Sequence, residues 1–342
     1  MVRIRTCWLV AALALSISAG ACKKNEKKAD TSAATAPTPG ATAEKVAPGG
    51  AAPAAAAATA AAGDDLGLLP VDSEMVMGLN FASLQKSPLW KKFVEPQLLK
   101  DDAQKKLTEF KDKCGFDPMS AVTSISLGMK GVGADKPDGV IVVHGPEKGK
   151  VLACIDKMKD EAAKEGTTIT NDNGVVTIKP KDDGDAMSFT YVNDTTLVGV
   201  IGPNSSPASV LAAAKGGSAL KTSPAFVEMY GKIKTGDSLW MLMNGNSKAF
   251  DQAASMGFKP KAVFGSVNVS DGLAVDLRVR LETPEQATQI AGMAKGQVGQ
   301  FAKMVDTLDI AAEASDVKVI VVVSAAKLET LISQFGGMLG GM

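Results

Sequence analysis

The clearest pattern in the chain is the alternation of apolar and polar residues in "LAVDLRVRL" (273–281). Leu or Val occupies every second position from Leu273 to Leu281, and Asp276, Arg278 and Arg280 stand between them. A period of two is typical of an antiparallel strand with one buried face. We therefore expect a strand here, with its three charged residues facing water.

Two further stretches predict strands of other kinds. "VIVVV" (319–323) has no alternation, which favours a central strand covered on both faces. "TNDNGVV" (170–176) carries Asn173-Gly174, a pair that accepts positive φ and predicts a tight hairpin.

Four helix starts are marked by a hydroxyl residue followed by proline. The hydroxyl accepts a hydrogen bond from an otherwise unpaired backbone N–H, and proline lacks the N–H that the first helical position cannot use. The four are Ser87-Pro88, Ser206-Pro207, Ser223-Pro224 and Thr283-Pro284. Gln286, three residues after Thr283, also fits a capping box.

These elements recur in two halves of the chain. "VDSEMVMGLN" (71–80) is similar to "GDSLWMLMN" (236–244), and "CGFDPMSAVTSISLGMKG" (114–131) is similar to "MGFKPKAVFGSVNVSDG" (256–272). We therefore predict an α+β fold of two diverged β-α-β-β-α-β-β repeats, with antiparallel sheets and helices packed on one face. The repeats are assigned to residues 66–215 and 216–335, followed by a flexible tail at 336–342.

The N-terminus has a different pattern. Arg3 and Arg5 precede an uncharged, mostly apolar run that ends in Ala19-Gly20-Ala21. The run is typical of a signal-peptide core and is shorter than the roughly 18–20 residues that span a bilayer. Residues 1–21 are therefore predicted to be a signal peptide.

Ala19-Gly20-Ala21-Cys22 resembles the lipobox of bacterial lipoproteins, although that family prefers Leu where this chain has Ala19. The resemblance implies that the Cys22 sulfur receives diacylglycerol, that the peptide is cut before Cys22 and that the new amino terminus is acylated. It implies a membrane partner through this lipid anchor, with palmitate among the acyl chains. Plain secretion after an ordinary signal-peptidase site, or an uncleaved membrane anchor, remain alternatives.

The same resemblance bears on localisation. In enteric bacteria, Asp after the lipidated cysteine retains a lipoprotein in the inner membrane, and this chain has Lys23. The resemblance therefore implies an outer-membrane lipoprotein, on its periplasmic or surface face.

Residues 22–65 read as the lipidated cysteine followed by a disordered linker. The segment is rich in Ala, Pro, Thr, Gly and Lys and has no aromatic residue, so it cannot bury enough apolar surface to offset its ordering entropy. As a coil it would span roughly 35–40 Å.

The net charge of the chain does not indicate a class of binding partner. The whole chain has 37 basic and 37 acidic residues, and loss of Arg3 and Arg5 with the signal leaves a net charge of −2. No basic patch indicates a nucleic-acid partner. Trp and Tyr are scarce, which argues against a site that stacks sugars.

Catalytic and cofactor signatures are few. His144 is the one histidine, and no nucleophile or metal-ligand set is spaced around it, so a strand-end residue is expected and no cofactor or metal is predicted. "GPEKGKV" (145–151) misses the phosphate-loop spacing and hydroxyl, and "KDDGDAM" (181–187) lacks the ligands of a calcium loop. We expect a helix start and a hairpin turn there.

Cys114 and Cys154 are the two cysteines left after Cys7 and Cys22 are accounted for. An even pair in an exported protein suggests a disulfide, provided that the helices carrying them lie on one face of the sheet. Two separate buried thiols are the alternative, favoured by Met256 in place of Cys114 in the second repeat.

The sequence is compatible with two functions. The first is a lipid-anchored binding or structural module of the cell envelope, with an envelope protein as a possible partner. The second is an envelope hydrolase whose residues are scattered along the chain. A deep polar pocket around His144 with converging Asp or Ser would favour the hydrolase, and a broad apolar groove would favour the binding module.

Overall fold

The structure is a computed structural model that describes residues 65–339, apart from 135, 182–183, 218–219, 252–257 and 300. Residues 1–64, which include the predicted signal peptide, Cys22 and nearly all of the linker, lie outside the described residues. The side chains of Asp101, Asp102, Ile332 and residues 334–339 are also outside the description.

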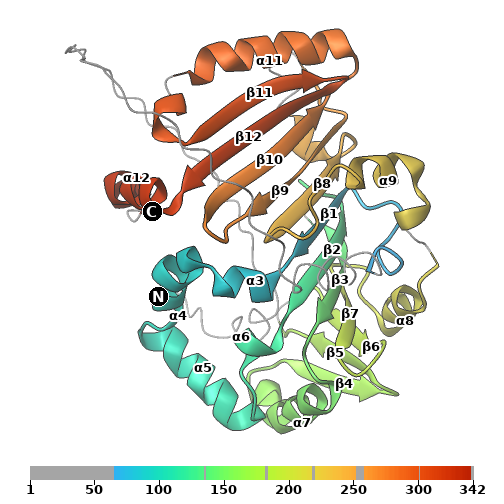
Figure 1. Cartoon of the computed structure of the whole chain (residues 1–342). Coiled ribbons are helices and arrows are strands. Elements are labelled where there is room, and N and C mark those ends of the chain that lie inside the picture. Colours follow the sequence, from blue (N-terminus) through green and yellow to red (C-terminus); the bar gives the residue numbers. More distant parts are fainter. Residues whose placement is uncertain are drawn as a thin grey trace. The chain divides into compact units, whose positions relative to one another are not determined.

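The described residues form one twelve-stranded sheet in which every neighbouring pair is antiparallel (Figure 1). The strand order is β11-β12-β10-β9-β8-β1-β2-β3-β7-β6-β5-β4. The strands are β1 (Met75–Leu79), β2 (Ser124–Lys130), β3 (Asp138–His144), β4 (Thr168–Asp172), β5 (Val175–Lys179), β6 (Met187–Tyr191), β7 (Thr196–Ile201), β8 (Leu239–Asn244), β9 (Ala262–Asn268), β10 (Gly272–Arg280), β11 (Thr307–Glu313) and β12 (Asp316–Ser324). The mixed α+β class with an antiparallel sheet is confirmed.

The helices connect these strands and cover the sheet. The α-helices are α3 (Phe81–Lys86), α4 (Glu95–Leu98), α5 (Asp101–Cys114), α6 (Pro118–Ala121), α7 (Lys148–Lys164), α8 (Pro207–Lys215), α9 (Pro224–Tyr230), α11 (Pro284–Val298) and α12 (Ala325–Leu339). A π-helical turn, η1 (Trp90–Val94), precedes α4, and three 3-10 turns are η2 (Leu220–Thr222), η3 (Lys248–Phe250) and η4 (Phe301–Met304).

β1 and β8 join the two halves of the sheet in a symmetrical register. Met77 lies opposite Met241, so the pairs on either side are Gly78 with Trp240 and Val76 with Leu242. The hydrogen bonds at the two ends match as well. Asn80 N donates to Ser238 O at 2.9 Å, and Asn244 N donates to Glu74 O at 2.8 Å.

Helices cover both faces of the sheet, so the prediction that they pack on one face is wrong. Val142 packs with Val210 of α8 and Phe226 of α9 in one buried cluster, whereas Val143 packs with α7 in another. Successive residues of a strand point to opposite faces. The ladders from β3 to β10 place Val279, which packs against α11, on the Val143 face. α7 and α11 therefore share one face, and α8 and α9 lie on the other.

β10 is an antiparallel strand as predicted, but its burial does not alternate: residues 273–280 are all half-buried, and its charged residues do not simply face water. The side chains of Asp276, Arg278 and Arg280 are 13%, 11% and 22% exposed. Arg278 donates to Glu313 Oε2 at 2.7 Å, and Arg280 pairs with the buried Asp316. The polar face of the strand is thus closed by ion pairs with residues of β11, β12 and α9.

β12 contains "VIVVV" and is flanked by strands on both sides, but it stands next to the sheet edge rather than at the centre. Its residues 318–322 are only partly buried. The lack of alternation therefore correctly predicts a strand with neighbours on both sides, but it does not predict how far that strand lies from the edge of the sheet.

The predictions of the Asn173-Gly174 turn and of the four N-caps are confirmed, but that of the capping box is not. At the first of these caps, Ser87 Oγ accepts from Trp90 N at 3.1 Å. Asn173 and Gly174 adopt φ of 54° and 82° between β4 and β5. Ser206, Ser223 and Thr283 each accept a backbone N–H at the start of α8, α9 and α11. Gln286 Oε1 accepts from Glu282 N, one residue before the cap, so the predicted capping box is shifted.

The C-terminal boundary differs from the prediction. α12 continues to Leu339, so residues 336–339 belong to a helix and not to the tail assigned to 336–342. Residues 340–342 lie outside the described residues. Among the helices of the described part of the chain, none has the length and apolar character needed to cross a bilayer.

Candidate functional site

The segment 65–73, called the strap here, lies across the sheet face that α8 and α9 cover. Leu66 and Leu69 are 5% and 1% exposed and belong to the same buried cluster as Val140 and Val142. The strap fits closely because Gly128 lies beneath it. A Cβ on Gly128 would stand 2.7 Å from Ser73 Oγ and 3.4 Å from Leu69 Cβ.

Asp65 fixes the start of the strap. Its carboxylate is 2% exposed and accepts from Ser126 Oγ at 2.6 Å through one oxygen. The other oxygen lies 2.7 Å from His144 Nε2. The sequence assigned Asp65 to the linker, and this boundary needs correction because a buried, doubly hydrogen-bonded carboxylate belongs to the folded body.

His144 is the last residue of β3, as expected, and it is held from both sides. Its Nδ1 lies 3.1 Å from Thr196 Oγ1, and Thr196 is 5% exposed. Asp65, Ser126 and Thr196 thus converge on or near the one histidine, an arrangement that no spacing in the sequence revealed. The four residues do not line the pocket described next.

An open pocket of about 500 Å³ lies between the strap, α8 and the sheet. Three groups of residues form its apolar walls: Leu68, Pro70 and Val71 from the strap, Val140 and Val200 from β3 and β7, and Ala212 and Ala213 from α8. Glycines at positions 128, 139 and 216 also line it. A pocket of this size with apolar walls is typical of a small-molecule site.

The polar groups of the pocket are mostly engaged with one another. Lys130 pairs with Asp72 at 2.5 Å, and both side chains are about half exposed, at 43% and 62%. Asp138 accepts from Asn204 N at 3.0 Å and from Asn204 Nδ2 at 2.6 Å. Lys130 lies directly opposite Asp138 in the β2–β3 ladder, but the ion pair that it forms is with Asp72. Among the described residues, no lysine or arginine forms an ion pair with Asp138.

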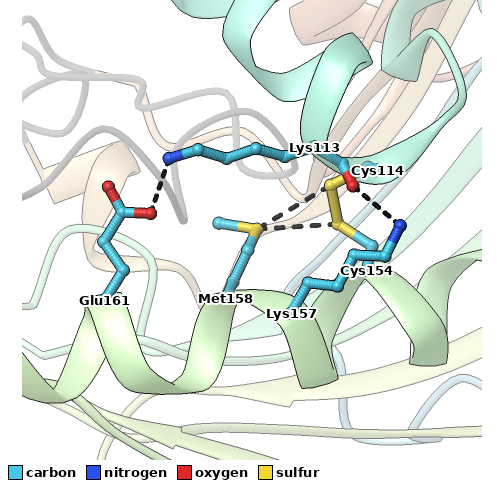
Figure 2. The surroundings of a disulfide bond; sticks show 6 residues. All are labelled: Lys113, Cys114, Cys154, Lys157, Met158 and Glu161. Carbon is cyan, nitrogen blue, oxygen red and sulfur yellow. Dashed lines mark hydrogen bonds and ion pairs between the residues drawn. A yellow bond between two sulfur atoms is a disulfide. The ribbon is translucent and has the colours of Figure 1, made fainter.

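Cys114 and Cys154 are joined by a disulfide that links the end of α5 to the second turn of α7 (Figure 2). The Cα atoms are 4.6 Å apart, and the bridge closes a sequence separation of 40 residues. α5 ends at Cys114 because Gly115 adopts φ 74°, a left-handed conformation that terminates the helix.

Further contacts surround the disulfide. Met158 Sδ lies 3.8 Å from Cys114 Sγ and 3.5 Å from Cys154 Sγ, so the thioether packs against the bridge (Figure 2). Lys113 Nζ donates to Glu161 Oε2 at 2.5 Å, and this hydrogen bond lowers the pKa of the Glu161 carboxyl. Lys157 Nζ donates to Lys113 O at 3.1 Å. The pair of helices is therefore connected by one covalent and several polar contacts.

A second polar cluster joins α9 to β10 and β12. Arg280 binds Asp316 through Nε and Nη2, and it also binds Glu228. The hydrogen bond from Arg280 lowers the pKa of Glu228 to about 2. Burial would raise the pKa of Asp316, but the hydrogen bonds from Arg280 and Lys232 outweigh it and the net direction is downward. All four residues are paired, so we interpret the cluster as a structural ion-pair network.

The other motifs have structural roles. Residues 145–151 form a turn and the start of α7, where Lys148 N donates to Asp194 O at 2.8 Å. In 181–187, two residues lie outside the described residues, and Asp185 pairs with Lys136 at 3.4 Å. Within the described part of the chain, no group of three or more His, Cys, Asp or Glu side chains could hold a metal ion. Cys22 lies outside it.

Comparison with known proteins adds no family. No family model, no curated protein and no solved structure matches this chain.

Proposed function

We propose that this chain is a lipid-anchored protein of the cell envelope whose folded body is a binding module. The anchor is the acylated Cys22, supported by the lipobox resemblance of residues 19–22. Each buried methylene contributes about 0.8 kcal/mol, so several acyl chains would hold the protein firmly at a bilayer. Lys23 supports the outer membrane as the destination.

The observation that carries the binding proposal is the position of the pocket relative to the strap. The strap is the first part of the body to follow the predicted linker, and Leu68, Pro70 and Val71 form one wall of the pocket. Asp65 and the two buried leucines hold that wall against the sheet. A ligand in this pocket would therefore be held at the root of the tether, close to where the body is attached.

The duplicated architecture is part of the proposal. The symmetrical β1–β8 register and the matching hydrogen bonds of Asn80 and Asn244 support two diverged repeats that begin at β1 and β8. In this alignment α7 corresponds to α11, and β6 and β7 correspond to β11 and β12. The hairpin β4–β5 and helix α6 are additions in the first repeat.

An envelope hydrolase remains a second candidate because of one arrangement. Thr196 Oγ1, His144 and Asp65 form a hydroxyl–imidazole–carboxylate chain, the order used by nucleophilic hydrolases. Both ends of this chain are nearly fully buried, and the pocket does not reach it. Hydrolysis of p-nitrophenyl butyrate by the purified chain, with loss of activity in Thr196→Val, would favour the hydrolase over the binding module.

The experiment that tests the anchor is metabolic labelling with palmitate, comparing the wild-type chain with Cys22→Ser. We expect label in the wild type only, with the wild type in the outer-membrane fraction of a density gradient and the variant in the soluble fraction. Crosslinking in intact cells would then identify any envelope protein that contacts the body. Label that persists in Cys22→Ser would contradict the proposal.

A further inference from the structure

The charges that line the pocket do not cancel. Of the lining side chains, Asp72, Lys130 and Asp138 carry formal charges, which leaves one negative charge in excess. Lys130 is already paired with Asp72. Asp138 stands at the start of β3, at one end of the pocket floor, directly opposite Lys130 in the β2–β3 ladder. One lysine thus serves two carboxylates, and its ion pair is with Asp72, which leaves Asp138 as the carboxylate without an ion pair among the described residues.

The hydrogen bonds of Asp138 leave it able to accept more. Each carboxylate oxygen receives one bond from Asn204. A carboxylate oxygen can accept about two hydrogen bonds. One bond comes from the backbone N–H of Asn204 and the other from its side-chain amide. Both donors are neutral, so they orient the carboxylate without neutralising its charge. A cationic N–H donor entering the pocket would gain a charge-assisted hydrogen bond there.

The rest of the pocket favours an apolar body. Its walls are aliphatic, and its lining residues include no aromatic side chain that could stack a sugar or a base. Ser209, the lining hydroxyl of α8, is engaged with Ser206, from which it accepts a backbone bond at 2.9 Å. At about 30 Å³ for each water-sized group, about 500 Å³ holds roughly 15–20 non-hydrogen atoms.

We propose, resting on the proposed binding function, that the pocket binds an organic cation with a single amine head and an aliphatic body. The ammonium group hydrogen-bonds to Asp138, and the body lies between the strap and α8 against Val140 and Val200. An anionic ligand of the same shape is disfavoured because it would place a second negative charge beside Asp138.

Three probes with the same eight-carbon alkyl tail separate the effect of head charge from that of tail burial: octylammonium, 1-octanol and nonanoate. Their binding is measured by isothermal titration calorimetry on the chain carrying Cys22→Ser, which needs no detergent to compete for the probes. We expect octylammonium to bind roughly fivefold or more tightly than 1-octanol, as a partly exposed charged hydrogen bond implies, and nonanoate to bind weakest.

Two substitutions test whether the probes bind in this pocket and whether Asp138 binds the ammonium head. Ala212→Trp, at an exposed pocket-lining position of α8, should weaken all three probes, whereas Leu211→Trp, at its exposed neighbour outside the pocket, should not. Asp138→Asn should remove the preference for the ammonium head without removing tail binding. Asp156→Asn is the matched control, because it removes one negative charge from α7 on the opposite face of the sheet.

A further variant covers the case in which Asp138→Asn fails to fold. Lys130→Gln removes the cation of the pocket and should strengthen octylammonium binding while leaving 1-octanol unchanged. Equal binding of nonanoate and octylammonium, still sensitive to Ala212→Trp, would overturn the ligand class and keep the pocket as a binding site. Absence of binding by all three probes would overturn the binding site itself.

Discussion

Gly78 of β1 lies directly opposite Trp240 of β8, and the indole ring of Trp240 covers its Cα. A Cβ on Gly78 would stand 2.3 Å from Trp240 Nε1 and 2.4 Å from Cε2. Trp240 is 2% exposed and packs edge-on against Tyr230 of α9, at 5.3 Å between ring centroids. The junction between the two halves of the sheet therefore depends on a position without a side chain.

Gly78→Ala should destabilise the protein by about 2 kcal/mol, because the added methyl overpacks a buried aromatic that has no room to move. The free energy of unfolding is measured in urea on the chain carrying Cys22→Ser. Gly149→Ala is the control, since nothing lies within 4 Å of its Cβ and alanine is the better helix former. A Gly78→Ala chain as stable as the parent would show that the indole does not rest on Gly78.

Asp65→Ala should destabilise the protein by about 2 kcal/mol, because Ser126 and His144 each lose a buried hydrogen-bond partner. The strap should also detach more often, since Asp65 fixes its first residue. Limited proteolysis within residues 65–73 reads out the detachment. Asp72→Ala, which removes only the exposed pair with Lys130, should cost less than about 1 kcal/mol. Equal effects of the two substitutions would contradict the role of Asp65.

Replacement of Cys114 and Cys154 by serine should cost about 4 kcal/mol, the chain-entropy value for a closed loop of 40 residues. The cost is seen in urea unfolding with and without reductant, and the double variant should not respond to reductant. Alkylation of the denatured, unreduced chain measures the redox state directly. Alkylation of both Cys114 and Cys154 in that assay, read from their peptides by mass spectrometry, would mean that the two cysteines are separate and buried, the alternative left open by the sequence.

Acid should weaken the link between α9 and β10. The pKa of Glu228 falls from 4.5 in the unfolded chain to about 2 in the folded one, so its contribution is present above pH 4.5 and is lost as the pH falls toward 2. Glu228→Gln should therefore lower stability at pH 7 by about 1 kcal/mol or less, after allowance for screening at a half-exposed carboxylate. The deficit should shrink at pH 3, and a deficit that grows on acidification would refute the assignment.

The local features of the fold were predictable because each depends on neighbouring residues. The alternation around Asp276, the Asn173-Gly174 turn and the caps at Ser206 and Ser223 all follow from short-range stereochemistry. Which face of the sheet each helix covers was not predictable. The helices capped by Ser206 and Ser223 lie between β7 and β8 and so connect the two halves of the sheet. They cover the opposite face from α7 because of the path that the chain takes from β7 to β8, which no local sequence pattern encodes.

The site depended even more on distant residues. Asp65 stands at the end of a polar, Ala-rich stretch, and nothing near it in the sequence distinguishes it from linker. Its partners Ser126 and His144 are 61 and 79 residues away. The pocket arises where the strap passes over glycines and valines of three strands, so no single motif encodes it. The near-miss phosphate-loop motif at 145–151 follows the end of β3 at His144, whereas Asp138 stands at the other end of that strand.

Mass spectrometry of the N-terminal peptide of the native, membrane-extracted protein tests the central claim of lipid anchoring most directly. The account predicts a peptide that begins at Cys22 and carries the added mass of a diacylglycerol thioether and an amide-linked acyl chain. A peptide that begins at another residue, or one that begins at Cys22 without added hydrocarbon, would contradict it.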